Sequence, residues 1–270
     1  MIIQHNMAAA NTNRQLGITN GNLAKSTEKL SSGYRINRAG DDAAGLSISE
    51  KMRGQIRGLE QASTNAQDGI SLIQTAEGAL NETHSMIQRM RELAVQSAND
   101  TNVTADRDAL AEEITALKAE IDRIATDTQF NEMELLDGTF KGKKFHIGAN
   151  ANQTIDVEIK SMKCNDIGLT TFDVKTQGGA ETAISAADTA LKNVSTQRSK
   201  LGAIQNRLEH TIANDDNTAE NLQAAESRIR DVDMANEMVR YSKDSILQQA
   251  AQSMLAQANQ STQGILNLLR

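Results

Sequence analysis

The sequence predicts a mainly α-helical protein, a long-helix coiled-coil bundle with a small β element in its core domain. Aromatic residues make up only 2% of the 270-residue chain, which has no proline and no tryptophan. Much of its apolar content is alanine, which fills narrow spaces between helices but cannot build a thick core. Apolar residues also recur every seven positions over long stretches, as in helices packed along partner helices.

The longest repeat defines the first core helix. Seven apolar residues follow one another at a spacing of seven: Met52, Leu59, Ala66, Ile73, Leu80, Ile87 and Ala94. A helix from about Ala43 to Ala98 would be roughly 80 Å long. Such a rod does not fold alone, and it therefore requires partner helices of similar length.

Two further stretches provide these partners. After a polar break at 99–108, the second stretch has apolar residues at four-three spacing: Leu110, Ile114, Leu117, Ile121 and Ile124. The third stretch begins near Gly179 and repeats at a spacing of seven: Ala187, Val194, Leu201, Leu208, then Asp215, Leu222 and Ile229. We interpret Asp215 as a local loosening of this helix. The three helices bury one another's stripes in a bundle with crossings near 20°.

The periodicity changes between the second and third helices. Ile155, Val157 and Ile159 alternate with polar residues, which predicts a half-buried strand. We expect a β element within about 140–175, with strand structure between Phe145 and Lys160 and a shorter first strand near the "FHI" at 145–147. All four phenylalanines of the chain fall in or near this region.

The two chain ends predict a separate terminal coiled-coil domain, formed by 1–42 with 235–270, beside a core domain at 43–234. Their apolar stripes consist of Leu16, Leu23, Leu30, Leu247, Met254, Ile265 and Leu269. Each end alone is a weak helix, and a single helix in water is marginal. We therefore expect both ends to become ordered only when each other and neighbouring copies cover these stripes.

Composition and charge exclude several function classes. The net charge of −7 argues against a nucleic-acid partner. No stretch approaches the roughly 18 apolar residues that a membrane span requires, and the N-terminal segment lacks the pattern of a cleavable signal peptide. The single cysteine, Cys164, excludes an internal disulfide framework. Both ends are poor in acidic residues, so the acidic excess lies in the middle of the chain.

Catalytic, metal and cofactor motifs are absent from the sequence. The four histidines are scattered, and none has a second ligand at zinc-binding spacing. We interpret His84, beside the longest stripe, as a packed or rim residue. No nucleophile has a recognisable supporting base, so we expect no enzyme, no cofactor and no metal site.

The segment "SSGYRINRAGDDAAG" at 31–45 interrupts the helical pattern. It could form a phosphate cradle, a metal loop or a joint between helices, but it lacks the lysine and serine of a Walker loop. Its glycines give the backbone freedom at a joint. We expect the polar side chains of the segment to hold that joint: Arg35, Arg38, Asp41 and Asp42.

A second polar feature lies on the first core helix, within "MIQRMRELAVQ" at 86–96. Helical geometry places Arg89, Glu92 and Leu93 on the face opposite Ile87. An exposed leucine between charged residues is typical of a contact surface. The alternative is a solvated, charged helix face with one stray leucine, and periodicity alone favours this alternative.

Five segments together resemble bacterial flagellin over essentially the whole chain. They are "KLSSGYRINRAGDDAAGLSISEKMRGQIRGL" (29–59), "MIQRMRELAVQSAND" (86–100), "QFNEMELLDG" (129–138), "AESRIRDVDMANEMV" (225–239) and "ILNLLR" (265–270). The middle of the chain lacks the variable outer domain that many flagellins insert. The resemblance therefore points to a short form of the family.

The resemblance implies a structural subunit that self-assembles into the bacterial flagellar filament for motility. It implies export of the unfolded chain through the flagellar channel, with an extracellular destination. The partners it implies are other flagellin subunits, a flagellar export chaperone, a filament cap protein, hook–filament junction proteins and host Toll-like receptor 5. The alternative is a hook–filament junction protein, which "RINRAGDDAAG" and "ILNLLR" disfavour.

The resemblance also assigns roles to particular residues. By position, the receptor contacts would be Gln88, Arg89, Leu93 and Glu113. The polar residues of the 31–45 joint would set how subunits lock together. Some flagellins carry a metalloprotease in the variable region, but this chain lacks that region.

Overall fold

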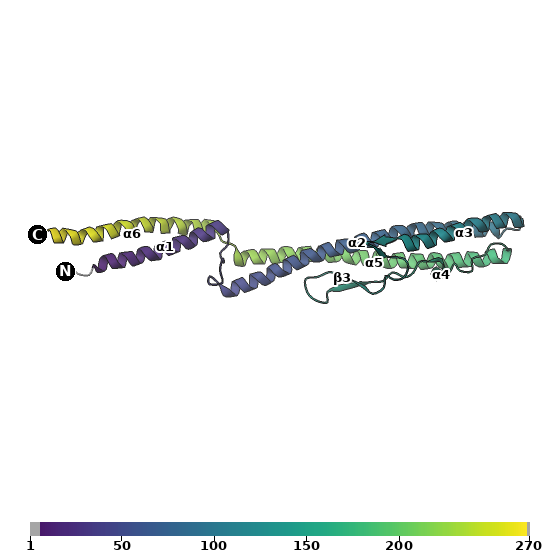
Figure 1. Ribbon diagram of the computed structural model, residues 1–270, viewed down its shortest axis with the longest axis horizontal. Helices are drawn as coiled ribbons and strands as arrows, with labels where there is room; N and C mark the ends of the chain where they lie inside the picture. Colours follow the sequence, from purple (N-terminus) through teal and green to yellow (C-terminus); the bar gives the residue numbers. More distant parts are fainter. Residues whose placement is uncertain (1–5, 269–270) are drawn as a thin grey trace. The chain divides into compact units, whose positions relative to one another are not determined.

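A computed structural model of the chain describes residues 6–268, with side chains described up to residue 261. The long helices are drawn in Figure 1. The elements in chain order are α1 (Met7–Ser32), α2 (Ala43–Ser97), α3 (Thr104–Asp127), β1 (Gln129–Phe130), β2 (Met133–Glu134), β3 (Lys143–His146), β4 (Thr154–Val157), α4 (Cys164–Ile167), α5 (Gln177–Arg230) and α6 (Met234–Leu268). The mainly α-helical fold class with a small β element is confirmed.

The chain divides into two compact units. The terminal unit combines residues 1–54 with 220–270, and the core unit comprises 55–219. The boundaries thus lie inside α2 and α5, whereas the sequence analysis places them at the helix ends near 42 and 235.

Three helices form the frame of the core unit, and ion pairs fix their directions. Arg91 of α2 pairs with Asp188 of α5 at 2.7 Å, and Arg198 of α5 pairs with Glu77 of α2 at 3.5 Å. Higher numbers on α2 therefore meet lower numbers on α5, so the two helices run antiparallel. The helix α3 lies along the end of α2, where the Arg107 guanidinium donates a hydrogen bond to the Ser97 carbonyl at 3.2 Å.

The predicted stripes form the core of this unit. The heptad positions of α2 from Leu59 to Ala94 are buried, and so are Val194, Leu201 and Leu208 of α5. The predicted loosening of α5 at Asp215 is wrong, because the helix is continuous from Gln177 to Arg230. Asp215 instead occupies the next heptad position as a carboxyl group that is 7% exposed. Its backbone hydrogen bonds stay within the helix, so one polar side chain does not break it.

Two small antiparallel hairpins make up the β element. Strands β3 and β4 pair from Lys143 with Val157 to His146 with Thr154, as the alternating pattern predicts. Strands β1 and β2 form a tighter hairpin that the sequence analysis missed. Its two turn residues, Asn131 and Glu132, both have positive φ, as a two-residue type I′ turn requires.

The segment after β4 joins the β element to the helices. The Gln197 side-chain amide of α5 donates to the Glu158 carbonyl at 3.2 Å, and Asn193 donates to the Ile167 carbonyl at 3.1 Å. Cys164 is buried at the start of α4, where its backbone N–H donates to the Asp122 carboxylate of α3 at 2.8 Å. Burial raises the pKa of the Cys164 thiol to about 12.

Among the described residues, no helix has the length and apolar character needed to cross a bilayer.

Candidate interaction surfaces

The helices α1 and α6 pair along their lengths within the terminal unit (Figure 1). The Ser26 hydroxyl donates to Glu237 at 2.6 Å, and both residues are buried. Gln248 donates to Asn20 at 2.9 Å, so the two helices run antiparallel. The predicted α1 stripe lies on the paired side, because Leu16, Leu23 and Leu30 are all half-buried.

The predicted α6 stripe lies elsewhere on its helix. Among the described side chains of α6, most of the buried or half-buried ones follow four-three spacing, with half-buried Ser245 beside this row: Glu237, Tyr241, Asp244, Gln248, Ala251, Leu255 and Ala258. Leu247 is 45% exposed and Met254 is 62% exposed, so α1 does not cover these two residues. Their predicted role in polymerisation, through neighbouring copies, stays a prediction. Ile265 belongs to the last turns of α6, whose side chains are not described, and Leu269 lies outside the described residues.

Leu247 and Met254 belong to a second apolar face of α6, which we call the outer α6 stripe. It consists of Val239, Ile246, Leu247 and Met254. At 100° per residue, this stripe points away from the row that faces α1. Among the described residues, ten of the thirteen large apolar side chains with high exposure belong to the terminal unit. Exposed apolar side chains are therefore concentrated in the terminal unit.

The joint between α1 and α2 is held by a second chain segment. Tyr34 and Asp231 form an isolated antiparallel bridge. Beside it, the Arg35 N–H donates to the Arg230 carbonyl at 2.7 Å, and the Val232 N–H donates to the Gly33 carbonyl at 3.0 Å. Gly33 ends α1 with φ of 74°, a left-handed conformation that favours glycine. The segment at 33–42 is therefore an ordered joint.

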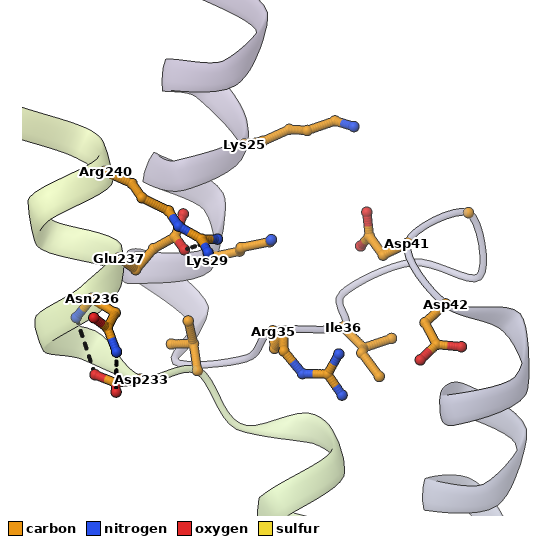
Figure 2. A pocket seen from close by; sticks show the side chains of 12 residues that line it. Lys25, Lys29, Arg35, Ile36, Asp41, Asp42, Asp233, Asn236, Glu237 and Arg240 are labelled. Atoms are coloured by element: carbon orange, nitrogen blue, oxygen red, sulfur yellow. Dashed lines mark hydrogen bonds and ion pairs between the residues drawn. The ribbon is translucent and has the colours of Figure 1, made fainter. Parts of the chain in front are cut away.

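Each predicted joint residue has a defined partner. The Asp41 carboxylate accepts the Arg38 N–H at 3.0 Å and the Asn37 N–H at 3.2 Å, and these bonds lower the pKa of Asp41. Asp42 accepts the Gly45 N–H at 2.8 Å and so caps the start of α2. Figure 2 places these two carboxylates beside the hollow that the joint borders.

The two arginines bond in different ways. The Arg38 guanidinium pairs with Glu28 of α1 at 3.0 Å. The Arg35 guanidinium donates to the Ile229 carbonyl near the end of α5. The four predicted polar residues of the joint thus all make contacts within the chain.

The sequence analysis missed the most central side chain of the joint, Arg230. Its guanidinium lies 4.9 Å from the centre of the Tyr34 ring and pairs with Glu50 of α2 at 2.6 Å. The Arg230 side chain is only 13% exposed. It connects the ends of α1, α2 and α5 within the terminal unit. A tyrosine directly after the helix-ending "SSG" gives the only hint of this stacking in the sequence.

The exposed face at 86–96 is centred on Arg89. Its guanidinium donates to Glu113 of α3 at 3.0 Å and pairs with Glu92 at 3.3 Å. This hydrogen bond to Glu113 is the main reason that the pKa of Arg89 is raised. Gln88 is also exposed, and it contacts His84, which is half-buried. Gln88, Arg89 and Glu113 therefore lie together on one surface.

Leu93 does not belong to that surface. It is 1% exposed, so the expectation of an exposed leucine contact is wrong. It belongs to the buried cluster of the core unit, which includes Ile114 of α3 and also Phe172 and Val174. One turn beyond Leu93, the buried Ser97 hydroxyl donates to the Val174 carbonyl at 2.5 Å, and Phe172 and Val174 are buried there. The periodicity of α2 alone does not show which other parts of the chain cover Leu93.

Two family models match most of the chain. The bacterial flagellin N-terminal helical region matches residues 3–141, and the bacterial flagellin C-terminal helical region matches residues 184–269. The first region includes the joint and the Arg89 face, and the second includes Asp215, Arg230 and the outer α6 stripe.

Relatives are similar along their whole length. The flagellin of Halalkalibacterium halodurans is 58% identical, and the flagellar filament 33 kDa core protein of Treponema phagedenis is 53% identical, in each case over all of both chains. The crystal structure of Bacillus cereus flagellin has a TM-score of 0.52 and 34% identity, covering 56% of this chain and 88% of that one. On this evidence, the chain belongs to the bacterial flagellin family.

Proposed function

We propose that the chain is a structural subunit that self-assembles into the bacterial flagellar filament. The observation that supports this most is the outer α6 stripe, which has apolar side chains at regular spacing and is exposed in the single chain. A lone protein gains nothing from such a stripe, whereas a polymer buries it. The names of full-length relatives, flagellin and flagellar filament core protein, support the same function.

The stripe is large enough to drive association. Full burial of one Val, Ile, Leu or Met side chain contributes about 1.5–3 kcal/mol. Burial of four partly exposed side chains per subunit therefore contributes several kcal/mol. A surface ion pair contributes at most about 1 kcal/mol. Apolar contact between copies is thus expected to dominate the free energy of assembly.

Assembly of the purified chain tests this function. The wild-type chain should form filaments in ammonium sulfate, because this salt is excluded from protein surfaces and strengthens apolar burial. Sedimentation and electron microscopy detect the filaments. The double variant Leu247→Glu/Met254→Glu should remain in the supernatant. The matched control, Gln249→Glu/Gln252→Glu, adds the same charges to exposed polar positions of α6 and should assemble. Normal filaments from the stripe variant would contradict the proposal.

Family resemblance supports further steps in the life of the subunit. We expect export of the unfolded chain through the flagellar channel, with a chaperone on the C-terminal segment and a cap protein at the growing tip. The destination is the extracellular filament, attached through hook–filament junction proteins. The chain acts as a structural protein without catalysis.

A second proposed function is contact with host Toll-like receptor 5 through the Arg89 face. The observation in its favour is that Arg89 and Glu113, from two different helices, are held together at 3.0 Å on an exposed surface. Leu93 would support this face from below, because it is buried. Arg89→Ala should weaken binding of the monomer to the purified receptor ectodomain by about tenfold or more.

The control for receptor binding is Arg123→Ala on α3. Arg123 is also exposed and also forms two ion pairs, with Glu120 and Asp127. Equal binding by the Arg89 variant and wild type would contradict the assignment of this face.

A further inference from the structure

The terminal unit contains a hollow of about 700 Å³ between α1, the joint at 33–42 and the start of α6. Figure 2 shows its lining side chains from these three elements. The buried Ile36 and the half-buried Val232 provide its apolar surface. Most of the other lining residues are charged: Lys25, Lys29, Arg35 and Arg240, with Asp41, Asp42, Asp233 and Glu237.

The carboxylates around the hollow already have hydrogen-bond donors. Asp41 and Asp42 accept backbone N–H groups of the joint and of α2, as described above. Asp233 accepts the Asn236 N–H at 3.1 Å and its side-chain amide at 2.6 Å, and these bonds lower the pKa of Asp233. Glu237 accepts the Ser26 hydroxyl and pairs with Arg240 at 3.5 Å. The carboxylates of the hollow therefore already have hydrogen-bond or ion-pair partners within the chain.

The cations of the hollow are less well satisfied. Lys25 and Lys29 are one helical turn apart on α1, and neither side chain has an ion-pair or hydrogen-bond partner among the described residues. Both ammonium groups act on Asp41 only as distant charges. The Arg35 guanidinium bonds to a neutral carbonyl. Among the described residues, Lys25, Lys29 and Arg35 thus border the hollow without a carboxylate as ion-pair partner.

The rest of the chain carries the complementary charge. The terminal unit has 12 basic and 10 acidic residues, a net charge of +2, whereas the core unit has 16 basic and 25 acidic residues, a net charge of −9. In a homopolymer, each copy therefore offers its neighbours a strongly acidic core unit.

We propose that this hollow is an intersubunit docking site, in which Lys25, Lys29 and Arg35 bind exposed carboxylates from the core unit of a second copy. The inference rests on the proposed polymer and names one of its polar contacts. Apolar burial by the outer α6 stripe holds copies together, and the hollow selects how they are placed, because a charge pair adds specificity more than affinity.

Zero-length crosslinking tests this docking directly. Filaments are grown from an equal mixture of ¹⁴N- and ¹⁵N-labelled chains and treated with a carbodiimide, which joins lysines only to carboxylates in contact. Mass spectrometry should then show Lys25 or Lys29 linked to an Asp or Glu of 55–219, with half of these products mixed in isotope. Links confined to one chain, links only to acids of the terminal unit, or no link at either lysine would each overturn the proposal.

Charge reversal provides a second, quantitative test. Lys25→Glu/Lys29→Glu should raise the chain concentration needed for assembly by about three- to tenfold, because each exposed pair contributes up to about 1 kcal/mol. High salt should reduce this difference. Lys51→Glu, on an exposed position of α2 outside the hollow, is the control. If wild type fails to assemble, the proposed function fails. If wild type and the double variant assemble equally, only the docking site fails.

Discussion

The core unit and the terminal unit are built from similar long helices, but they differ in what covers those helices. In the core unit, α2 and α5 pack with α3, two hairpins and the segment at 169–174, so that their apolar rows are buried. In the terminal unit, α1 and α6 pair mainly with each other. A helix pair has only one internal seam, and any second apolar row must face outward.

This difference explains why the core unit buries its own apolar rows while the terminal unit exposes apolar surface for association. The row of α6 that faces α1 includes polar residues such as Asp244 and Gln248, whereas the outer α6 stripe contributes four large apolar side chains. The outer α6 stripe, which has the larger apolar side chains, is thus available for contacts with other copies. We infer that the core unit carries its own stability and that the terminal unit gains most of its stability from neighbouring copies.

The largest expected effect comes from placing the same charge in each unit. Leu201→Glu puts a carboxylate at a position of α5 that is 0% exposed, and it should destabilise the core unit by about 3–5 kcal/mol. Leu247→Glu on the outer α6 stripe should leave core unfolding unchanged but reduce assembly. Thermal unfolding followed by circular dichroism, together with sedimentation, separates the two outcomes. Equal loss of core stability in both variants would contradict the proposed difference between the two units.

A second substitution should sharpen the comparison by improving the core unit. Asp215 is a buried carboxyl in the apolar row of α5, and its Oδ2 atom has no hydrogen-bond partner. A buried polar group without a hydrogen-bond partner costs about 1–3 kcal/mol, and an apolar side chain at the same position avoids this cost. Asp215→Leu should therefore raise the free energy of unfolding of the core unit, whereas Asp216→Leu at an exposed position should change it little. A loss of stability in Asp215→Leu would contradict this account.

The same residue predicts a pH dependence. Desolvation, with a contribution from Asp216, raises the pKa of Asp215 in the folded chain above that in the unfolded chain. The protonated carboxyl is therefore favoured by folding, and this stability is lost as the pH rises through the folded pKa. Acidification from neutral pH towards pH 4 should narrow the stability difference between wild type and Asp215→Asn. A constant difference over this range would contradict the shift.

A smaller, local effect is expected at the joint. Arg230→Ala removes a cation–π contact with Tyr34 and an ion pair with Glu50, together about 1–2 kcal/mol. Backbone amides of 33–42 should exchange faster with solvent, while amides of the core unit stay protected. Arg228→Ala, at an exposed position of the same helix end, is the matched control. Unchanged exchange in the Arg230 variant would show that backbone bonds alone hold the joint.

The smallest effect concerns the reactivity of Cys164, which reports on the core unit alone. Its raised pKa keeps the thiol protonated near pH 8, so a thiol reagent should label the folded chain far more slowly than an ordinary cysteine. Leu201→Glu should accelerate labelling, whereas Leu247→Glu should not. Rapid labelling of the wild-type chain would contradict the burial of Cys164.

Much of the fold is predictable from the sequence because long heptad stripes leave few alternatives. The expected first core helix, from Ala43 to Ala98, differs from α2 by one residue at its end. The hairpin at 129–134 was missed because it contains only two short strands, whose signal lies in the turn conformation of Asn131 and Glu132. Asp215 was misread because one polar residue in a stripe does not show whether the helix breaks or tolerates it.

The interaction surfaces are less predictable, since they depend on what covers each helix. The periodicity of α2 places Leu93 on the exposed face, but it belongs to a buried cluster that also contains residues of α3 and of the segment at 169–174. Leu247 and Met254 were identified correctly as an apolar row, yet the sequence does not show that a more polar row faces α1. Arg230 was missed because its partners, Tyr34 and Glu50, are distant in sequence.

Hydrogen–deuterium exchange of the monomer and of the filament tests the central claim most directly. In the monomer, amides of α1 and α6 should exchange much faster than those of α2 and α5 in the core unit, because fewer buried contacts oppose local opening. In the filament, the terminal amides should become protected while the core amides change little. Equal protection of both units in the monomer, or no gain at α1 and α6 on assembly, would contradict the account.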